Sequence, residues 1–502
     1  MEVDFKQSLL KDKEGNILIS SNRAIARDTT DTHVNNMTTD EMQMQINYLR
    51  RRLSSFSMID TEEKQSTLST ALIICNNTIG SACMILPIIF SNCGIINCLL
   101  IMILIGIAQF ATCKLCIIHL RPEEPDIPQI IDRLLTRTWK ALFVLSSVVF
   151  EFLCGIVYLI LMNNMLYPIL IFIFEKCGFE NYAKKSENRY DIFSFQINAW
   201  IFLIPIYMTC YIKDIKIITI ISKIGIYVLV SFIVFLIYIF IDNVVSGRLM
   251  DNLHRINYVS PNITEASGAL SLAFFVHNCV CTLIKNIENK DDGKKAVGLS
   301  YVFTFIFYFL IGIIGYFGIL GRNTVDDYPQ TIMDYFEKES IFPFIIEIFY
   351  FLKLMTVYPL FCFVTRNQFF ALIFENKGKD KQNADPHQKS DDSHWIAGII
   401  YNTVYIGISM VCVLYNINLT FIMGLTGAVF GFILVYVIPI GIHLKCFYFG
   451  GEKHAQCNPH PEKNERSKWT QIIFYVGIIG LFGVYLMVIQ LIQLFSFDWL
   501  KE

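Results

Sequence analysis

The chain has 502 residues, of which 54% are hydrophobic and only 17% are charged. A soluble domain carries about 25% charged residues, so this composition excludes an ordinary soluble protein and indicates a membrane protein. The net charge of −2 gives no support to nucleic-acid binding, which relies on an excess of Lys and Arg.

The chain begins with a polar stretch that precedes the first apolar run. Its composition predicts a cytosolic, largely disordered N-terminal tail over residues 1–66. The opening letters MEVDFKQSLLKDKEGN have no apolar core, so no cleaved secretory signal is expected. The piece TDEMQMQINYLRRRLSSFSMI has apolar residues at a helical spacing and could form a surface-lying or pore-plugging helix, although a simple tail is favoured.

Eleven apolar runs follow the tail, and each approaches the roughly 20 residues that a membrane-crossing helix needs. In chain order, spans 1 to 11 cover about 68–90, 95–119, 140–175, 195–212, 217–241, 266–286, 298–320, 341–365, 395–414, 418–444 and 470–496. Span 3 is too long for one crossing, so its end near Pro168 is expected to kink or to leave the membrane. Strand-like alternation is absent, so we predict an all-α integral membrane protein with about eleven transmembrane helices.

Lysine and arginine residues gather on one side of the predicted spans. The N-terminal tail and the loops after spans 2, 4, 6, 8 and 10 hold most of them, which predicts a cytoplasmic N-terminus. The sequon Asn262-Ile263-Thr264 then falls in an outward loop, where a glycan can be attached. The sequence is compatible with either the plasma membrane or a vacuolar or lysosomal membrane.

Span 1 reads TLSTALIICNNTIGSACMILPIIFSNCG, and its centre is unusual for a plain anchor. The small polar side chains of Asn76–Thr78 and Ser81 compete for backbone hydrogen bonds, and Pro87 removes one backbone donor. Irregular backbone inside a membrane is tolerated only where protein or a water-filled cavity surrounds it. We therefore predict a functional break across Asn76–Ala82, with a kinked, closely packed helix as the alternative.

Span 6 reads ASGALSLAFFVHNCVCTLIKNIENK and places His277 and Asn278 in the middle of an apolar run. An ionisable residue at that depth is costly and is a functional candidate by default. We predict a second break across Phe274–Cys279. A core histidine that donates to a carbonyl is the alternative.

Spans 1 and 6 stand five apart, which is the arrangement expected of an inverted repeat. We predict a transporter domain over residues 67–496, with one repeat over 67–241, a second over 265–445 and an additional helix over 470–496. A broken helix offers backbone N–H groups to a carboxylate and carbonyl oxygens to a cation. An amino acid carries both charges and is the predicted substrate.

Five places in the chain resemble the amino acid/auxin permease family, in particular its sodium-coupled neutral amino acid transporter branch. They are Asn76-x-x-x-Gly80-Ser81 with Leu86-Pro87, Cys154-Gly155-Ile156-Val157-Tyr158, Phe274-Phe275-Val276-His277-Asn278, Thr356-Val357-Tyr358-Pro359-Leu360 with Arg366-Asn367, and Gly424-Leu425-Thr426-Gly427-Ala428 with Val437-Ile438-Pro439 and Leu444-Lys445. The resemblance covers about residues 66–496. It implies a LeuT-like 5+5 inverted repeat of the APC superfamily with helices 1 and 6 broken, and secondary transport of amino acids by alternating access, with neither enzymatic activity nor a cofactor.

The predicted site follows from the two breaks and from the resemblance. Residues expected to bind the substrate are Asn77, Thr78, Ile79, Gly80, Ser81, Ala82, Phe274, His277 and Asn278. The coupling ion, a proton or sodium, is expected at Asn76, Ile79, Lys353 and Thr356.

Two of these coupling residues, Asn76 and Thr356, stand where the resemblance implies a sodium site. Lys353 lies one helical turn before Thr356, and its ammonium could take the place of the ion. Snorkelling of Lys353, or its pairing with Glu347 or Glu151, is the alternative.

Several other residues carry weaker hypotheses. Glu151, in span 3, is expected either to pair with a bundle lysine or to carry protons, and Tyr158 either lines the pocket or packs. The spacings of Cys113 with Cys116, and of His454, Cys457 and His460, resemble metal motifs but lack further ligands, so no metal site is predicted. Two functional alternatives stay open, an amino-acid sensor that signals through the tail and a channel. The oligomeric state is open as well.

Overall fold

The structure, a computed structural model, describes part of the chain. The described residues are 9–11, 17–19, 66–121, 126–179, 193–210, 225–284, 287, 289–322, 330–336, 341–374, 390–415, 417–448 and 465–496. The chain divides into two units, Met1–Asp60 and Thr61–Glu502. The helix proposed within the tail and the spaced His and Cys residues between 454 and 460 lie outside the described residues.

The described part of the first unit consists of two short strands, β1 (Leu9–Lys11) and β2 (Ile17–Ile19). They pair antiparallel, with Leu10 opposite Leu18. No strand was predicted in this polar stretch.

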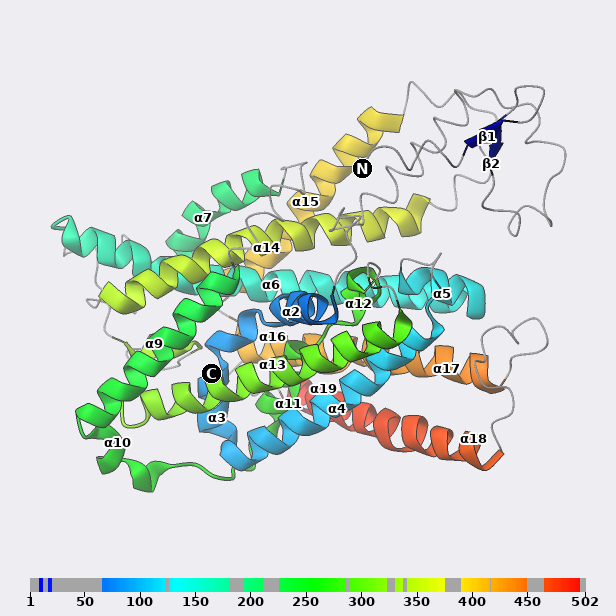
Figure 1. The fold of residues 1–502 in the computed structure, drawn as a ribbon. Helices are drawn as coiled ribbons and strands as arrows, with labels where there is room; N and C mark the ends of the chain where they lie inside the picture. The colour runs from blue at the N-terminus through cyan, green and yellow to red at the C-terminus, as the bar shows by residue number, and fades with distance from the viewer. Residues whose placement is uncertain are drawn as a thin grey trace. The chain divides into compact units, whose positions relative to one another are not determined.

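The described part of the second unit is helical (Figure 1). Its α-helices are α2 (Thr67–Thr78), α3 (Leu86–Cys93), α4 (Ile95–His119), α5 (Ile127–Leu134), α6 (Arg137–Lys176), α7 (Phe195–Thr209), α9 (Gly225–Val245), α10 (Arg248–Asp251), α11 (Ile263–Ala273), α12 (His277–Leu283), α13 (Lys290–Ile319), α14 (Ile341–Phe374), α15 (Ser390–Leu414), α16 (Leu419–Gly424), α17 (Ile438–Tyr448), α18 (Glu465–Ile472) and α19 (Leu481–Ser496). Short 3-10 turns are η2 (Ser81–Met84), η4 (Leu253–Arg255) and η5 (Ile332–Tyr335), and π-helical stretches are η6 (Leu425–Phe430), η7 (Ile433–Val437) and η9 (Ile473–Gly480).

Within the described residues, eight helical segments are long and apolar enough to cross a membrane. These segments lie in α4, α6, α9, α13, α14, α15, α16 to α17, and α18 to α19. Span 4 corresponds to α7, a shorter apolar helix. Spans 1 and 6 correspond to two pairs of half-helices, α2 with α3 and α11 with α12. The described residues of all eleven predicted spans are therefore mainly helical, and the helices of spans 1 and 6 are broken, as predicted.

The helix α6 runs through Pro168 without ending there. With 40 residues it is about 60 Å long, roughly twice the hydrocarbon thickness of a bilayer. The sequence predicted a kink or an exit from the membrane near Pro168. The structure shows that the helix continues past this residue.

Helix α13 approaches α3 closely because two of its residues are glycines. A Cβ atom at Gly312 would collide with the ring of Phe90, and one at Gly315 would collide with the ring of Pro87. Pro87 itself lies in the first turn of α3, where no helical hydrogen bond needs its missing N–H.

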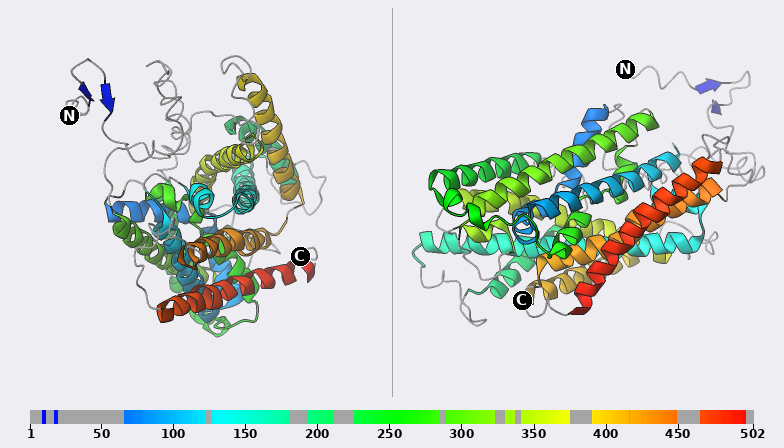
Figure 2. Two further views of the ribbon diagram at one scale, coloured as in Figure 1. Left: turned by 90° about the vertical axis from the view of Figure 1, so that its right-hand side faces the viewer. Right: turned by 90° about the horizontal axis from the view of Figure 1, so that it is seen from below.

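The helices around the two breaks form two sets. The first bundle comprises α2, α3, α4, α11, α12 and α13, which pack on one another. The second bundle comprises α6, α7, α14 and α15. Helix α9 packs on α13 and α14 and thereby contacts both bundles, as α16 does through α11 and α6. The last segment, α18 to α19, runs beside α17 (red and orange in Figure 2).

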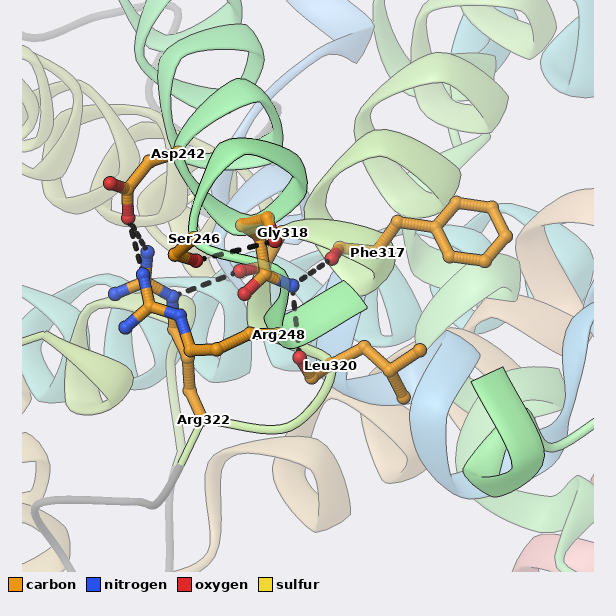
Figure 3. A network of polar contacts seen from close by, with 8 residues as sticks. Asp242, Ser246, Arg248, Phe317, Gly318, Leu320 and Arg322 are labelled. Carbon is orange, nitrogen blue, oxygen red and sulfur yellow. Dashed lines mark hydrogen bonds and ion pairs between the residues drawn. The ribbon is translucent and has the colours of Figure 1, made fainter. Parts of the chain in front are cut away.

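A polar network joins the end of α9 to the end of α13 (Figure 3). The side chain of Asn243 is fully buried, and its amide donates to the carbonyls of Phe317 at 2.7 Å and Leu320 at 2.9 Å. These carbonyls belong to the last turn of α13, where helix geometry leaves them without partners. The more exposed Asp242 accepts hydrogen bonds from both Arg248 and Arg322.

Candidate functional site

The first half of span 1 ends later than predicted. Asn76 and Asn77 lie within α2, and the N–H of Ile79 still donates to Cys75 O at 2.9 Å. The hydroxyl of Thr78 donates to Ile74 O at 2.8 Å, so this small polar residue bonds to its own helix instead of unwinding it. The predicted break across Asn76–Ala82 is thus narrower, with extended backbone at Ile79 and non-helical backbone at Gly80 before η2.

The break in span 6 covers three residues. Helix α11 ends at Ala273, and Phe274, Phe275 and Val276 separate it from α12. The prediction placed the break across Phe274–Cys279, but His277 already opens α12 and Asn278 lies within it. The helical hydrogen bond from Val280 N–H to Val276 O shows that the second half begins immediately after the break.

One tyrosine of α13 connects the two breaks. The hydroxyl of Tyr308 lies 2.9 Å from the carbonyl oxygen of Thr78 and 3.1 Å from that of Ala273, which are the last residues of α2 and α11. Carbonyl groups at helix ends lack intrahelical partners, and a hydroxyl has one proton to share between them. Phe274 packs edge-on against the Tyr308 ring, with centroids 5.5 Å apart. No motif pointed to Tyr308.

A second tyrosine approaches the break in span 1 from α6. A Cβ atom at Gly80 would lie 2.8 Å from the hydroxyl oxygen of Tyr158, so this close approach requires a glycine. The same hydroxyl lies near Ser81. The Tyr158 hydroxyl therefore lies beside the broken backbone.

The predicted substrate residues differ in exposure. Asn77 is exposed and Thr78 is half-buried, as is Gly80. Ile79, Ser81 and Ala82 are buried, Phe274 and His277 have no exposed surface, and Asn278 is half-buried.

His277 packs against α4. Its Nε2 lies 3.0 Å from the hydroxyl oxygen of Thr112, which donates to helix carbonyls, and its buried Nδ1 has no hydrogen-bond partner among the described residues. Nε2 thus has a hydrogen-bond partner, as expected of a core histidine, whereas Nδ1 has none in the described part of the chain.

Two of the four predicted coupling-ion residues meet at the break. The Nζ of Lys353, on α14, donates to Ile79 O at 3.3 Å and lies 5.6 Å from the centre of the Tyr350 ring. Lys353 makes no ion pair within the described part of the chain. The hydroxyl of Thr356 donates to Lys353 O at 2.7 Å, within its own helix. Within the described residues, no hydrogen bond joins the Asn76 side chain to this site.

Comparison with known proteins adds a family and a fold. A sequence model of a family described as "Transmembrane amino acid transporter protein" matches residues 63–493. "Neutral amino acid transporter 9" of Danio rerio is 25% identical over 221 residues, which are 43% of this chain and 35% of that protein. The protein of that name from Rattus norvegicus is 26% identical over 218 residues, 43% of this chain and 34% of the relative. The chain thus matches about a third of the length of these relatives.

Two further similarities extend over more of the chain. "Sodium-coupled neutral amino acid transporter 9 homolog" of Caenorhabditis elegans is 20% identical over 442 residues, covering 77% of this chain and 69% of the relative. Among solved structures, the crystal structure of MhsT in complex with L-phenylalanine covers 86% of this chain and 100% of its own, with a TM-score of 0.54 and 12% identity. At this identity the likeness shows the fold alone, which is the LeuT-like fold.

Proposed function

Because the chain belongs to the transmembrane amino acid transporter family, as its motifs predicted, we propose that it carries amino acids across a membrane by alternating access. One observation carries this proposal: two helices, five spans apart, are broken, and Tyr308 bonds to the end of the first half of each. Broken helices at corresponding places in two repeats are a strong structural pointer to a transporter's substrate site.

The substrate is proposed to lie against the two breaks. Its carboxylate would accept hydrogen bonds from the backbone N–H groups of Gly80 to Ala82, and the adjacent hydroxyl of Tyr158 offers a further donor. Its ammonium would face the carbonyls at the end of α11, near Ala273. Phe274 and His277 would shape the side-chain pocket.

Alternating access is proposed to arise from movement between the two bundles. The breaks belong to the first bundle, while Tyr158 and Lys353 reach them from the second. A change in the relative position of the bundles would therefore open the substrate site to one side and close it to the other.

We propose that the ammonium of Lys353 takes the place of a sodium ion at Ile79 O. The contact of 3.3 Å places the terminal nitrogen of Lys353 against a carbonyl that helix geometry leaves open. Transport would then need no sodium and would be either coupled to protons or uncoupled.

The test is transport by the purified full-length protein in proteoliposomes. We expect saturable counterflow of labelled amino acids, which a channel would not give. Absence of counterflow for every proteinogenic amino acid would contradict the proposal. No observation within the described residues favours a sensor that signals through the N-terminal tail, and a sensor is not proposed.

A further inference from the structure

A carboxyl group is buried in the second bundle, away from the substrate residues of span 1. Glu151 of α6 is 6% exposed. Its Oε1 accepts hydrogen bonds from Asn278 Nδ2 at 3.1 Å, from Gln368 Nε2 at 3.2 Å and from Ser147 Oγ at 3.5 Å. Three donors from α12, α14 and α6 thus converge on one oxygen.

The other carboxyl oxygen has no partner in the part of the chain that the structure describes. There, Oε2 of Glu151 is buried without a hydrogen bond, and so are Oδ1 of Asn278 and Oε1 of Gln368. Glu151 makes no ion pair within the described residues, and Lys353 bonds to Ile79 instead. The predicted pairing of Glu151 with a lysine of the bundle is therefore wrong for the described part of the chain.

The ionisable groups around Glu151 do not supply a countercharge. The groups near it are the thiols of Cys154 on α6 and Cys279 on α12 and the phenol of Tyr401 on α15. Charged side chains on the packed elements have partners of their own: on α14, Arg366 donates to Asn402, and on α5, Arg133 donates to His119 O and Asp132 pairs with Lys140. The elements α16 and η6 carry no ionisable residue.

A buried carboxylate without a cation is costly, and such a group loses its charge by binding a proton. The hydrogen bonds around Glu151 match a neutral acid, in which Oε1 is the carbonyl oxygen that accepts and Oε2 carries the proton. We propose that Glu151 is the proton-binding site that couples proton movement to transport. This inference rests on the proposed transport function and places the coupling site away from Lys353.

The position of the cluster explains how a proton would be linked to the conformational change. Asn278 belongs to the first bundle, immediately after the break in span 6, whereas Glu151, Ser147 and Gln368 belong to the second. Protonated Glu151 can stay buried in contact with Asn278. When the site is open to the side of higher proton concentration, Oε2 binds a proton from water and the bundles close. When the site then opens to the opposite side and water enters, the proton leaves Oε2 for water on that side.

Substitution of the carboxyl group by an amide tests this inference. Glu151→Gln keeps the shape and the acceptor oxygen but cannot release a proton. In sodium-free proteoliposomes with a pH-sensitive dye inside, an added amino acid is expected to acidify the lumen with the full-length wild type. With Glu151→Gln we expect counterflow to persist while acidification and accumulation driven by a pH gradient fall to background. Glu175→Gln, the same change on the same helix outside the cluster, is expected to behave as wild type.

Failure of this inference is distinguishable from failure of the proposed function. Wild type without counterflow contradicts the transport function. Counterflow without acidification in the wild type, or acidification that persists in Glu151→Gln, overturns the role of Glu151 alone.

A second measurement needs no variant. Dicyclohexylcarbodiimide reacts with protonated carboxyl groups in apolar surroundings, and mass spectrometry of the wild type then reports whether Glu151 is modified. We expect modification that decreases as the pH rises and that abolishes acidification in step. Unmodified Glu151 across the pH range of transport would overturn the inference, even if Glu151→Gln fails to fold.

Discussion

The hydroxyl of Tyr308 lies 2.9 Å from the carbonyl oxygen of Thr78, at the last residue of the first half-helix. The same hydroxyl lies 3.1 Å from Ala273 O, at the corresponding point of the second broken helix. A single side chain of α13 therefore satisfies the carbonyl ends that both breaks expose. This arrangement holds the two interruptions next to each other.

Tyr308→Phe is predicted to impair transport and to lower the thermal stability. It keeps the ring that packs on Phe274 but removes the hydroxyl proton shared by the part-buried contact with Thr78 O and the buried contact with Ala273 O, which costs about 1–3 kcal/mol. Uptake rates and thermal melting in detergent measure both effects. The matched control is Tyr301→Phe, because Tyr301 also stacks on Phe274 and its buried hydroxyl, which lies near the Cys113 thiol, has no hydrogen bond to either break among the described residues. Equal behaviour of the two variants would contradict the role of Tyr308.

Gly80→Ala is predicted to disturb the break in span 1. The new methyl group would lie 2.8 Å from the Tyr158 hydroxyl oxygen, and such overpacking costs about 1–3 kcal/mol. Thermal melting of the single variant, of Tyr158→Phe and of the double variant forms a double-mutant cycle. Because Tyr158→Phe removes the colliding atom, we expect the double variant to recover most of the stability that Gly80→Ala loses. Purely additive losses would show that the two residues are not in contact.

Transport by the wild type is predicted to be independent of sodium. Lys353→Ala removes the ammonium at Ile79 O, so uptake is expected to fall or to become sensitive to sodium. Uptake under imposed sodium and proton gradients distinguishes these cases. Lys176→Ala is a suitable control, since Lys176 also lies over an aromatic ring, that of Phe172, but at the exposed end of α6. Sodium-driven uptake that Lys353→Ala leaves unchanged would exclude replacement of the ion.

In the network between α9 and α13, substitution of Asn243 is predicted to lower the stability of the protein more than substitution of Asp242. Asn243→Ala leaves the carbonyls of Phe317 and Leu320 without their buried donor, at a cost of about 1–3 kcal/mol. The side chain of Asp242 is 42% exposed, so loss of its ion pairs in Asp242→Asn should cost about 0–1 kcal/mol. Thermal melting compares the stability of the two variants. A larger loss of stability in Asp242→Asn than in Asn243→Ala would contradict this prediction.

The existence of both breaks was predictable because their signals are local. Small polar residues and a proline flank the break in span 1, and His277 and Asn278 directly follow the break in span 6. The bounds shifted by two or three residues, because Thr78 bonds to its own helix and His277 can open a new one. Local signals indicate that a helix is interrupted, whereas the exact residue depends on which hydrogen bonds the surroundings offer.

The side chains that hydrogen-bond at or next to the breaks were not predictable, since they come from distant parts of the chain. Tyr308 is 230 residues from Thr78 in sequence, and Glu151 is 127 residues from Asn278 and 217 from Gln368. Tyrosines are common in this chain, and only the position of the Tyr308 hydroxyl between the last residues of α2 and α11 distinguishes Tyr308. The family motifs identified the helices that meet but not the side chains that join them.

The measurement closest to the central claim is an experimental structure of the full-length protein with an amino acid bound. The account predicts that both helices stay broken at Ile79–Gly80 and Phe274–Val276. It also predicts that the substrate carboxylate lies within hydrogen-bond distance of the backbone N–H groups of Gly80 to Ala82. An amino acid bound elsewhere, or unbroken helices through both segments, would contradict it.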